Sequence, residues 1–187
     1  RIWRNCSIVT RPPSRPRTAR RSPRSPETCA TGARGAQARF LDAVLAPFEH
    51  ASIDAALGDF RPELVVVPGG GSGFHDSSMR PERFAEWAAA IAAAGRRVVF
   101  VAGPSFKTPL VENQNFRVLR NLAGGALMSL LARTRLVLVN GGDTLVQSIV
   151  LGKACVAVPI AGDQPARIAR CVELGVALAP GIKALFV

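Results

Sequence analysis

Five consecutive residues, Asn140-Gly141-Gly142-Asp143-Thr144, have the types and spacing that suit an anion site. They follow the unbroken apolar run Leu136–Val139, and Gly152 stands where a short helix starting near Asp143 or Thr144 would end. A glycine turn between a buried strand and a helix presents backbone N–H groups and the positive end of the helix dipole. We therefore predict that the Gly142–Thr144 amides and the Thr144 hydroxyl hold a diphosphate.

Gln147 lies one helical turn beyond this segment, where its side chain would reach a ribose attached to that diphosphate. The same residues also allow a purely structural interpretation. Thr144 and Gln147 have the spacing of a capping box, and residues 140–142 have the composition of an ordinary turn. The sequence leaves both interpretations open.

A glycine-rich loop, Gly69-Gly70-Gly71-Ser72-Gly73, follows a second apolar run, Leu64–Val67. Backbone amides in such a loop can approach a phosphate closely, although a plain tight turn explains it equally well. The loop is not a P-loop, because no G-K-[ST] follows. It also lacks the dinucleotide fingerprint and the nucleophile elbow, because Asp76 and Phe74 occupy positions that require glycine.

Three further polar residues are candidates for ligand contacts. Asp163 and Gln164 follow the apolar run Cys155–Val158 and precede a predicted helix, so they can bond the hydroxyls of a sugar. Capping of that helix by Asp163 is the structural alternative. His75, just beyond the glycine loop, is a weak candidate for a catalytic or phosphate contact, and a solvated loop residue is the simpler interpretation.

Strands and helices alternate along the part of the chain that carries these residues. Short apolar runs predict strands, helical periodicity predicts helices, and glycines separate them. The predicted strands are Leu64–Val67, Val98–Val101, Phe116–Leu119, Leu136–Val139, Cys155–Val158 and Val176–Leu178, and the predicted helices begin near Pro81, Ala126, Asp143 and Ala166. This alternation predicts an α/β fold, a doubly wound parallel sheet with helices on both faces.

Charge is concentrated at the start of the chain. Residues 1–40 hold ten arginines and one glutamate, a net of +9, whereas residues 41–187 hold 14 basic and 12 acidic residues, a net of +2. We expect residues 1–40 to be a disordered Arg/Pro/Ser-rich segment or not to be native protein; a nucleic-acid or membrane arm and a transit peptide are alternatives. Residues 41–60 are predicted to be a helical linker, and residues 61–187 a folded domain that is truncated. Nucleic acid is an unlikely partner because the folded part is nearly neutral.

The cysteines and the apolar runs limit the remaining classes. The four cysteines have no paired C-x-x-C spacing and only two histidines are present, so we predict no metal site. Cys155 lies inside an apolar run, which indicates a small buried hydrophobe. No run is long enough to span a membrane. We expect a cytoplasmic protein, with peripheral association at the inner face of the membrane as an alternative.

The order of the motifs resembles the C-terminal, donor-binding half of GT-B glycosyltransferases. A strand with a glycine-rich loop is followed by N-G-G-D-T-x-x-Q, then G-K, then a strand ending in P-x-x-x-D-Q. The likeness is greatest to family 28, which includes the transferase that adds N-acetylglucosamine to lipid I. It covers roughly residues 61–180, and its specific part is residues 139–175.

The resemblance implies roles for individual residues. The loop residues Gly70, Gly71, Ser72 and Gly73 would face the diphosphate and the cleft between two domains, and the backbone of Asn121 and Leu122 would contact the uracil edge. The turn, with Asn140, Gly141, Gly142, Asp143 and Thr144, would hold the diphosphate. Gln147 would contact the ribose, and Asp163 with Gln164 would read the donor sugar.

Two positions depart from the family pattern. Gln147 stands where a glutamate is usual, which replaces a charged hydrogen-bond acceptor with a neutral amide. Arg167 stands where the family often has asparagine. About 60 residues precede Leu64, too few for the second Rossmann-like domain that supplies the acceptor site and the catalytic base in this family.

The resemblance implies half of an inverting, metal-independent transferase that moves a hexosyl group from a UDP-sugar to an acceptor hydroxyl. No cofactor is expected besides the UDP-sugar co-substrate. The acceptor is a glycan, a lipid-linked sugar or a small molecule, and the fragment alone would be inactive. A nucleotide-sugar hydrolase or 2-epimerase of the same fold is one alternative. A non-catalytic donor-binding subunit that works with a separate acceptor subunit is another.

Overall fold

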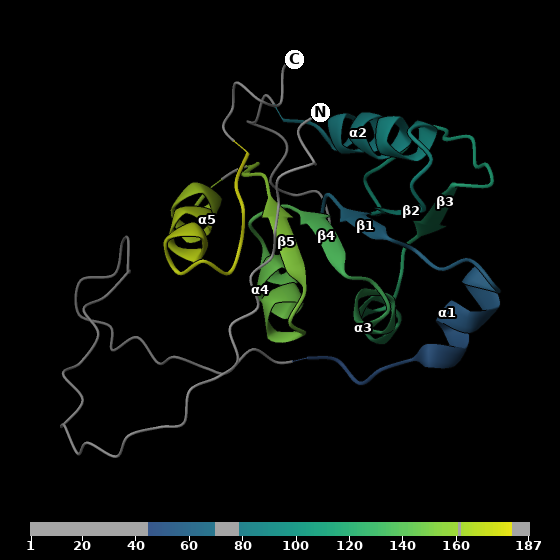
Figure 1. The fold of residues 1–187 in the computed structure, drawn as a ribbon, viewed down its shortest axis with the longest axis horizontal. Coiled ribbons are helices and arrows are strands. Elements are labelled where there is room, and N and C mark those ends of the chain that lie inside the picture. The colour runs from purple at the N-terminus through teal and green to yellow at the C-terminus, as the bar shows by residue number, and fades with distance from the viewer. Residues whose placement is uncertain (1–44, 70–78, 161, 181–187) are drawn as a thin grey trace. The chain divides into compact units, whose positions relative to one another are not determined.

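The computed structural model describes residues 45–69, 79–160 and 162–180, and within them five strands form one parallel sheet (Figure 1). The strand order is β3-β2-β1-β4-β5. The predicted doubly wound α/β fold is therefore confirmed. In chain order the elements are α1 (His50–Leu57), β1 (Leu64–Val67), α2 (Pro81–Ala93), β2 (Val98–Ala102), β3 (Phe116–Arg120), α3 (Gly124–Ala132), β4 (Leu136–Val139), α4 (Asp143–Val150), β5 (Ala154–Ala157) and α5 (Gln164–Glu173).

Strand β1 lies at the centre of the sheet, between β2 and β4. All four of its residues are buried, because helices cover both faces of a central parallel strand. Val65 is paired with Val99 of β2 and with Val137 of β4. The chain proceeds outward from β1 to β2 and β3, and then returns to the other side of β1 at β4. The gap between the carboxyl ends of β1 and β4 is thus the topological switch point of the sheet.

The two faces of the sheet bury separate apolar clusters. Phe84 and Ala88 of α2 pack with Val66 and Phe100 on one face. The other face carries α1, α3, α4 and α5, with Ile53, Leu130, Leu145 and Ile168 among the buried side chains. Figure 1 shows α2 on one side of the strands, and α3 and α4 on the other. Right-handed crossovers produce this arrangement when the strand order reverses.

Several predicted boundaries differ from the structure. Strands β2 and β3 each extend one residue further than predicted, to Ala102 and Arg120, and α3 begins at Gly124 rather than near Ala126. Strand β5 starts one residue early, at Ala154, and ends at Ala157. Helix α5 starts at Gln164 rather than Ala166, because Pro165 suits the first turn of a helix. The predicted last strand, Val176–Leu178, is reduced to one parallel bridge between Leu178 and Val156.

The prediction that Cys155 is a small buried hydrophobe is confirmed. Its side chain is 3% exposed within the cluster that α4 and α5 cover. Burial raises the pKa of the Cys155 thiol to about 11, so the thiol stays protonated at neutral pH. It therefore behaves as a small apolar side chain.

Helix α1 is held against α3 by a hydrogen-bonded ion pair. Arg133, directly after α3, donates from Nη1 to Oδ1 of Asp54 at 2.5 Å and from Nη2 to the carbonyl oxygen of His50 at 3.3 Å. Because α1 lies in residues 41–60, this contact joins the predicted helical linker to the sheet domain.

We expect the contribution of Asp54 to stability to disappear in acid. The hydrogen bond from Arg133 holds the pKa of the Asp54 carboxyl below its ordinary value of 3.8. A folded-state pKa below the unfolded one means that the pair stabilises the fold above the unfolded pKa and stops doing so as the pH falls through the folded pKa. Asp54→Asn should thus be slightly less stable than wild type in urea at about pH 7, and the difference in stability should be smaller at about pH 3. An equal gap at both pH values would contradict this.

Candidate functional site

The carboxyl ends of β1 and β4 bring two predicted site segments together. Pro68 and Gly69 follow β1, and the turn Asn140–Gly142 follows β4, so both lie at the switch point where open α/β sheets bind ligands. The predicted loop residues Gly70, Gly71, Ser72 and Gly73, and His75 beyond them, lie outside the described residues. Their predicted roles stay predictions.

Asn140 bonds to both segments with its side-chain amide. Its Nδ2 donates to the carbonyl oxygen of Pro68 at 2.9 Å, and its Oδ1 accepts from the amide of Gly142 at 2.9 Å. Gly69 permits this approach, because a Cβ at that position would overlap Nδ2 of Asn140 and the backbone φ there is +98°. The glycine after β1 therefore has a demonstrated structural role.

Gln164 and Arg167, from α5, hold the same turn from the side of β5. Gln164 Oε1 accepts from the amides of Gly141 at 3.2 Å and Ile160 at 3.0 Å. Arg167 donates from Nη1 to the carbonyl oxygen of Gly141 at 2.9 Å and from Nη2 to Oδ2 of Asp163 at 2.5 Å. The turn after β4 is thus bonded to Pro68 after β1 and to two side chains of α5, and Gln164 links it to Ile160 after β5.

These bonds determine which backbone amides can meet a ligand. Of the three amides predicted to face a diphosphate, that of Gly142 is already bonded to Asn140. Within the described part of the chain, no group accepts a hydrogen bond from the amides of Asp143 and Thr144, or bonds to the side chains of Thr144 and Gln147. The start of α4 therefore offers two amides, a hydroxyl and a side-chain amide.

The capping-box alternative for this helix is wrong. Helix α4 begins at Asp143 with Gly142 as its N-cap residue, and no side chain of the N-cap residue caps the first turn of the helix. Thr144 is consequently the second helical residue, two positions after the N-cap and too late to cap the helix. This removes the main structural explanation for Thr144 and Gln147.

The pair Asp163 and Gln164 bonds within the domain. Asp163 is the N-cap residue of α5, as the structural alternative predicted, but its side chain makes no cap bond and pairs instead with Arg167. The Asp163 side chain remains 64% exposed. Bonding to a sugar is compatible with this geometry for the second carboxylate oxygen of Asp163 and for Nε2 of Gln164.

Asn121 and Leu122 stand at the carboxyl end of β3. Asn121 has a left-handed backbone with φ of +51°, and its amide donates to the carbonyl oxygen of Ala102 at 3.1 Å. Leu122 packs against the core on the α3 side. Three strand spacings separate β3 from β4, which is about 14 Å. The segment Asn121-Leu122 and the turn after β4 thus lie at the same carboxyl edge of the sheet but are not in contact.

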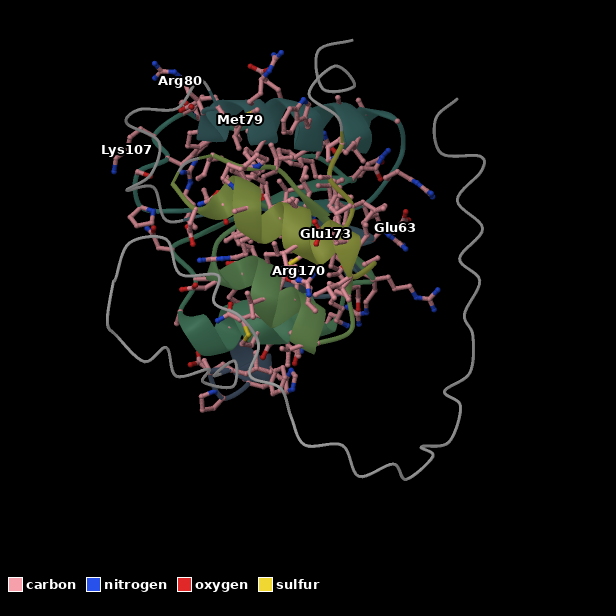
Figure 2. The ribbon with its side chains drawn as sticks, turned by 90° about the vertical axis from the view of Figure 1, so that its left-hand side faces the viewer. Glu63, Met79, Arg80, Lys107, Arg170 and Glu173 are labelled. Atoms are coloured by element: carbon pink, nitrogen blue, oxygen red, sulfur yellow. The ribbon has the colours of Figure 1, made fainter. Side chains whose placement is uncertain are left out.

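Positive side chains lie at this same edge. Arg80, the N-cap residue of α2, and Lys107, in the loop after β2, appear together on one side of the domain in Figure 2, whereas Glu63, directly before β1, appears on the other. Glu63 is paired with Arg96 and Arg97 at 3.2 and 3.6 Å. Among the residues that the structure describes, no group of three His, Cys, Asp or Glu side chains could hold a metal ion.

Arg167 is the residue whose position in the site sequence reasoning did not assign. It was noted only as a departure from a family pattern. The spacing Asp163-x-x-x-Arg167 at the start of a helix is the signal that predicts the ion pair, because residues i and i+4 lie on one face. No local signal predicts the bond to the carbonyl oxygen of Gly141, which is 26 residues away in the chain.

Comparison of the sequence with protein-family profiles and with curated proteins finds no match. Solved structures do share the fold. The spinosyn rhamnosyltransferase SpnG is 19% identical with a TM-score of 0.60, and the aligned part covers 84% of this chain and 41% of SpnG. Arabidopsis thaliana UGT89C1, in complex with UDP-L-rhamnose, is 21% identical with a TM-score of 0.52, over 70% of this chain and 32% of that one.

A third similar structure is the UDP-GlcNAc 2-epimerase of Methanocaldococcus jannaschii, in complex with UDP-GlcNAc and UDP. It is 14% identical with a TM-score of 0.52, over 70% of this chain and 38% of that chain. The chain spans about a third of the length of the solved structures that it matches. No helix among the described residues is long and apolar enough to cross a membrane. At these identities the likeness establishes one thing, a Rossmann-like α/β fold of the kind found in GT-B glycosyltransferases.

Proposed function

We propose that residues 61–187 are the donor-binding half of a glycosyltransferase that uses a UDP-sugar. The single observation that carries the proposal is the start of α4. Two unengaged amides, the Thr144 hydroxyl and Gln147 meet there at the switch point of a doubly wound sheet. Helix N-termini at this position bind the phosphates of nucleotides. Similar folds occur in solved structures whose descriptions include UDP-2-fluoro-glucose, UDP-L-rhamnose and thymidine diphosphate.

In the proposed reaction the acceptor hydroxyl attacks the anomeric carbon of the donor sugar, and the bond from that carbon to the diphosphate breaks. A base in a second domain takes the hydroxyl proton. The Asp143 and Thr144 amides and the helix dipole stabilise the negative charge that develops on the departing diphosphate, with no metal ion required. We propose inversion at the anomeric carbon and a family 28-like donor site.

In the proposed complex, the other contacts with the donor come from residues at the same carboxyl edge of the sheet. The backbone at Asn121 and Leu122 would meet the nucleobase, Gln147 the ribose, and Asp163 with Gln164 the sugar. The acceptor site would lie on a second domain or on a partner chain. We propose that the acceptor is a glycan, a lipid-linked sugar or a small molecule. We place the protein in the cytoplasm, with peripheral membrane association as an alternative.

One alternative function has a specific observation in its favour. The fold is shared with a UDP-GlcNAc 2-epimerase at a TM-score of 0.52, so a nucleotide-sugar 2-epimerase or hydrolase would use the same donor half. Incubation of the chain with UDP-GlcNAc tests this alternative, because release of UDP or epimerised sugar without an acceptor would identify a hydrolase or epimerase and contradict an inactive donor half. A non-catalytic donor-binding subunit would bind the nucleotide and release nothing.

Calorimetric titration of the full chain with UDP, UDP-GlcNAc, thymidine diphosphate and GDP tests the proposal. Binding of UDP or UDP-GlcNAc in preference to GDP is the expected result. Absence of binding by every nucleotide at millimolar concentration would refute both the transferase and the binding-subunit interpretations.

Thr144→Ala should weaken UDP binding by about 1 kcal/mol, roughly fivefold in affinity, because one hydrogen bond to the diphosphate is lost. The fold should be unaffected, since the Thr144 hydroxyl bonds to nothing in the described structure. Thr108→Ala is the matched control. Thr108 lies in the loop after β2, and its hydroxyl donates to Oε1 of Glu82 in α2 at 3.2 Å. Equal UDP affinities for wild type, Thr144→Ala and Thr108→Ala would exclude the Thr144 hydroxyl from the site.

A further inference from the structure

Asn140 connects two parts of the chain that are 72 residues apart. Its side chain is 7% exposed and uses donor and acceptor at once, toward Pro68 after β1 and Gly142 before α4. The first bond crosses the switch point. The second fixes the backbone immediately before the helix that would receive the ligand.

The bond between Asn140 and the Gly142 amide affects which backbone amides remain available to a ligand. The amide of Gly142 points at Oδ1 of Asn140, and the amide of Gly141 points at Oε1 of Gln164. Both glycine amides are therefore directed into the domain, and within residues 45–69, 79–160 and 162–180 the amides of Asp143 and Thr144 at the start of α4 have no acceptor. Without the Asn140 bond, the Gly142 amide would lose its acceptor and could turn toward the ligand.

We propose that Asn140 is a positioning residue: it fixes the turn so that the amides of Asp143 and Thr144, and not those of the glycines, meet the diphosphate. The proposal rests on the proposed function, since it concerns how the same site is held. Asn140 itself does not contact the ligand. It acts through the Gly142 amide and through the Pro68 carbonyl, which is adjacent to the glycine loop.

The chemistry of the side chain explains why asparagine stands at this position. The site requires a donor toward Pro68 and an acceptor toward Gly142 on one short, planar group. Aspartate keeps the acceptor, but it places an oxygen against the Pro68 carbonyl oxygen and a negative charge next to a diphosphate. Alanine provides neither bond and leaves the partly buried amide of Gly142 and the buried carbonyl of Pro68 unpaired.

The test uses the full chain labelled with nitrogen-15, as wild type, Asn140→Ala, Asn140→Asp and Asn113→Ala. Asn113 is the matched control, because its Oδ1 accepts from the amide two residues ahead, that of Asn115, at 2.8 Å. Asn140 accepts from the amide of Gly142 in the same way, but Asn113 lies just before β3, at the amino ends of the strands and away from the proposed site. For each protein we would measure thermal unfolding, hydrogen exchange at the Gly142 amide, and UDP affinity.

In wild type the Gly142 amide should be protected, and UDP should shift the resonances of Asp143 and Thr144 more than those of Gly141 and Gly142. Asn140→Ala should accelerate exchange at Gly142 by about tenfold or more and raise the Kd for UDP by about tenfold. Asn140→Asp should keep Gly142 protected and still bind UDP at least tenfold more weakly. Asn113→Ala should leave both quantities within about twofold of wild type.

Several outcomes would overturn the proposal. Unchanged exchange at Gly142 in Asn140→Ala would show that the bond does not hold the turn, and unchanged UDP affinity in a folded Asn140 variant would show that the bond does not matter for binding. If Asn140→Ala fails to fold, the UDP affinity of Asn140→Asp is the deciding measurement, and an affinity equal to that of wild type would overturn the proposal. If wild type binds no nucleotide, the proposed function fails, and exchange at Gly142 alone decides whether Asn140 holds the turn.

Discussion

Gly141→Ala should both destabilise the protein and weaken nucleotide binding. A Cβ on Gly141 would lie 2.6 Å from Cβ of Gln164, 3.0 Å from Cδ1 of Ile168 and 3.1 Å from Cα of Gln164. Because these atoms belong to α5, relief of the overlap requires the helix or the turn to move. We expect a loss of about 2 kcal/mol of unfolding free energy, as for overpacking of a tight core.

The same displacement removes the bonds that hold the turn. The Gly141 amide donates to Gln164, and the Gly141 carbonyl oxygen accepts from Arg167, so both are lengthened when α5 moves away. UDP affinity should fall by about tenfold or more, since each hydrogen bond contributes about 1 kcal/mol. Urea unfolding and calorimetric titration measure the two effects. Wild-type affinity together with reduced stability would show that the turn does not serve the ligand.

Gly125→Ala should undock the segment before α1 from α3. A Cβ at Gly125 would overlap the carbonyl oxygen of Pro47 and lie 2.6 Å from Oε1 of Glu49. The Pro47 atom is backbone, so the clash is not relieved by a side-chain rotation. It would also disturb the bond from the Glu49 amide to the Gly125 carbonyl oxygen at 3.2 Å. The expected cost is about 2 to 3 kcal/mol of unfolding free energy.

Gly124→Ala is the matched control for this prediction. Gly124 precedes Gly125 in the first turn of α3, and a Cβ there would meet only Cβ of Ala46, at 3.3 Å. Alanine is also the better helix former, by up to about 1 kcal/mol. Gly124→Ala should therefore stay within about 1 kcal/mol of wild type in urea unfolding. Equal stabilities of the two variants would contradict the close packing on Gly125.

The strands were predictable because most of them are buried on both faces. A central parallel strand must be apolar at every position, so the runs Leu64–Val67 and Leu136–Val139 match β1 and β4 residue for residue. The end of α4 was predictable for another reason. Gly152 has φ of +67°, a backbone conformation that glycine adopts without strain. The errors occur at the edge of the sheet, where Val176–Leu178 has few partners and reads as a strand by composition alone.

The bonding of the candidate site was less predictable than its location. A glycine turn after a buried strand is a local pattern, and it correctly placed the start of α4. The acceptor of each amide is not a local property. Asn140, Gln164 and Arg167 take their partners from other loops, and a side chain that resembles a ligand contact in sequence can instead hold the backbone.

The sequence by itself therefore determined the α/β alternation, the position of the turn at the end of a buried strand, and the candidate residues around it. Only the tertiary structure decided that the two glycine amides are already bonded and that the amides of Asp143 and Thr144 have no acceptor among the described residues. The physical reason is that periodicity and turn composition act over a few residues, whereas the hydrogen bonds of Asn140 and Gln164 join segments 72 and 23 residues apart. Such bonds exist only after the sheet has brought the strand ends together.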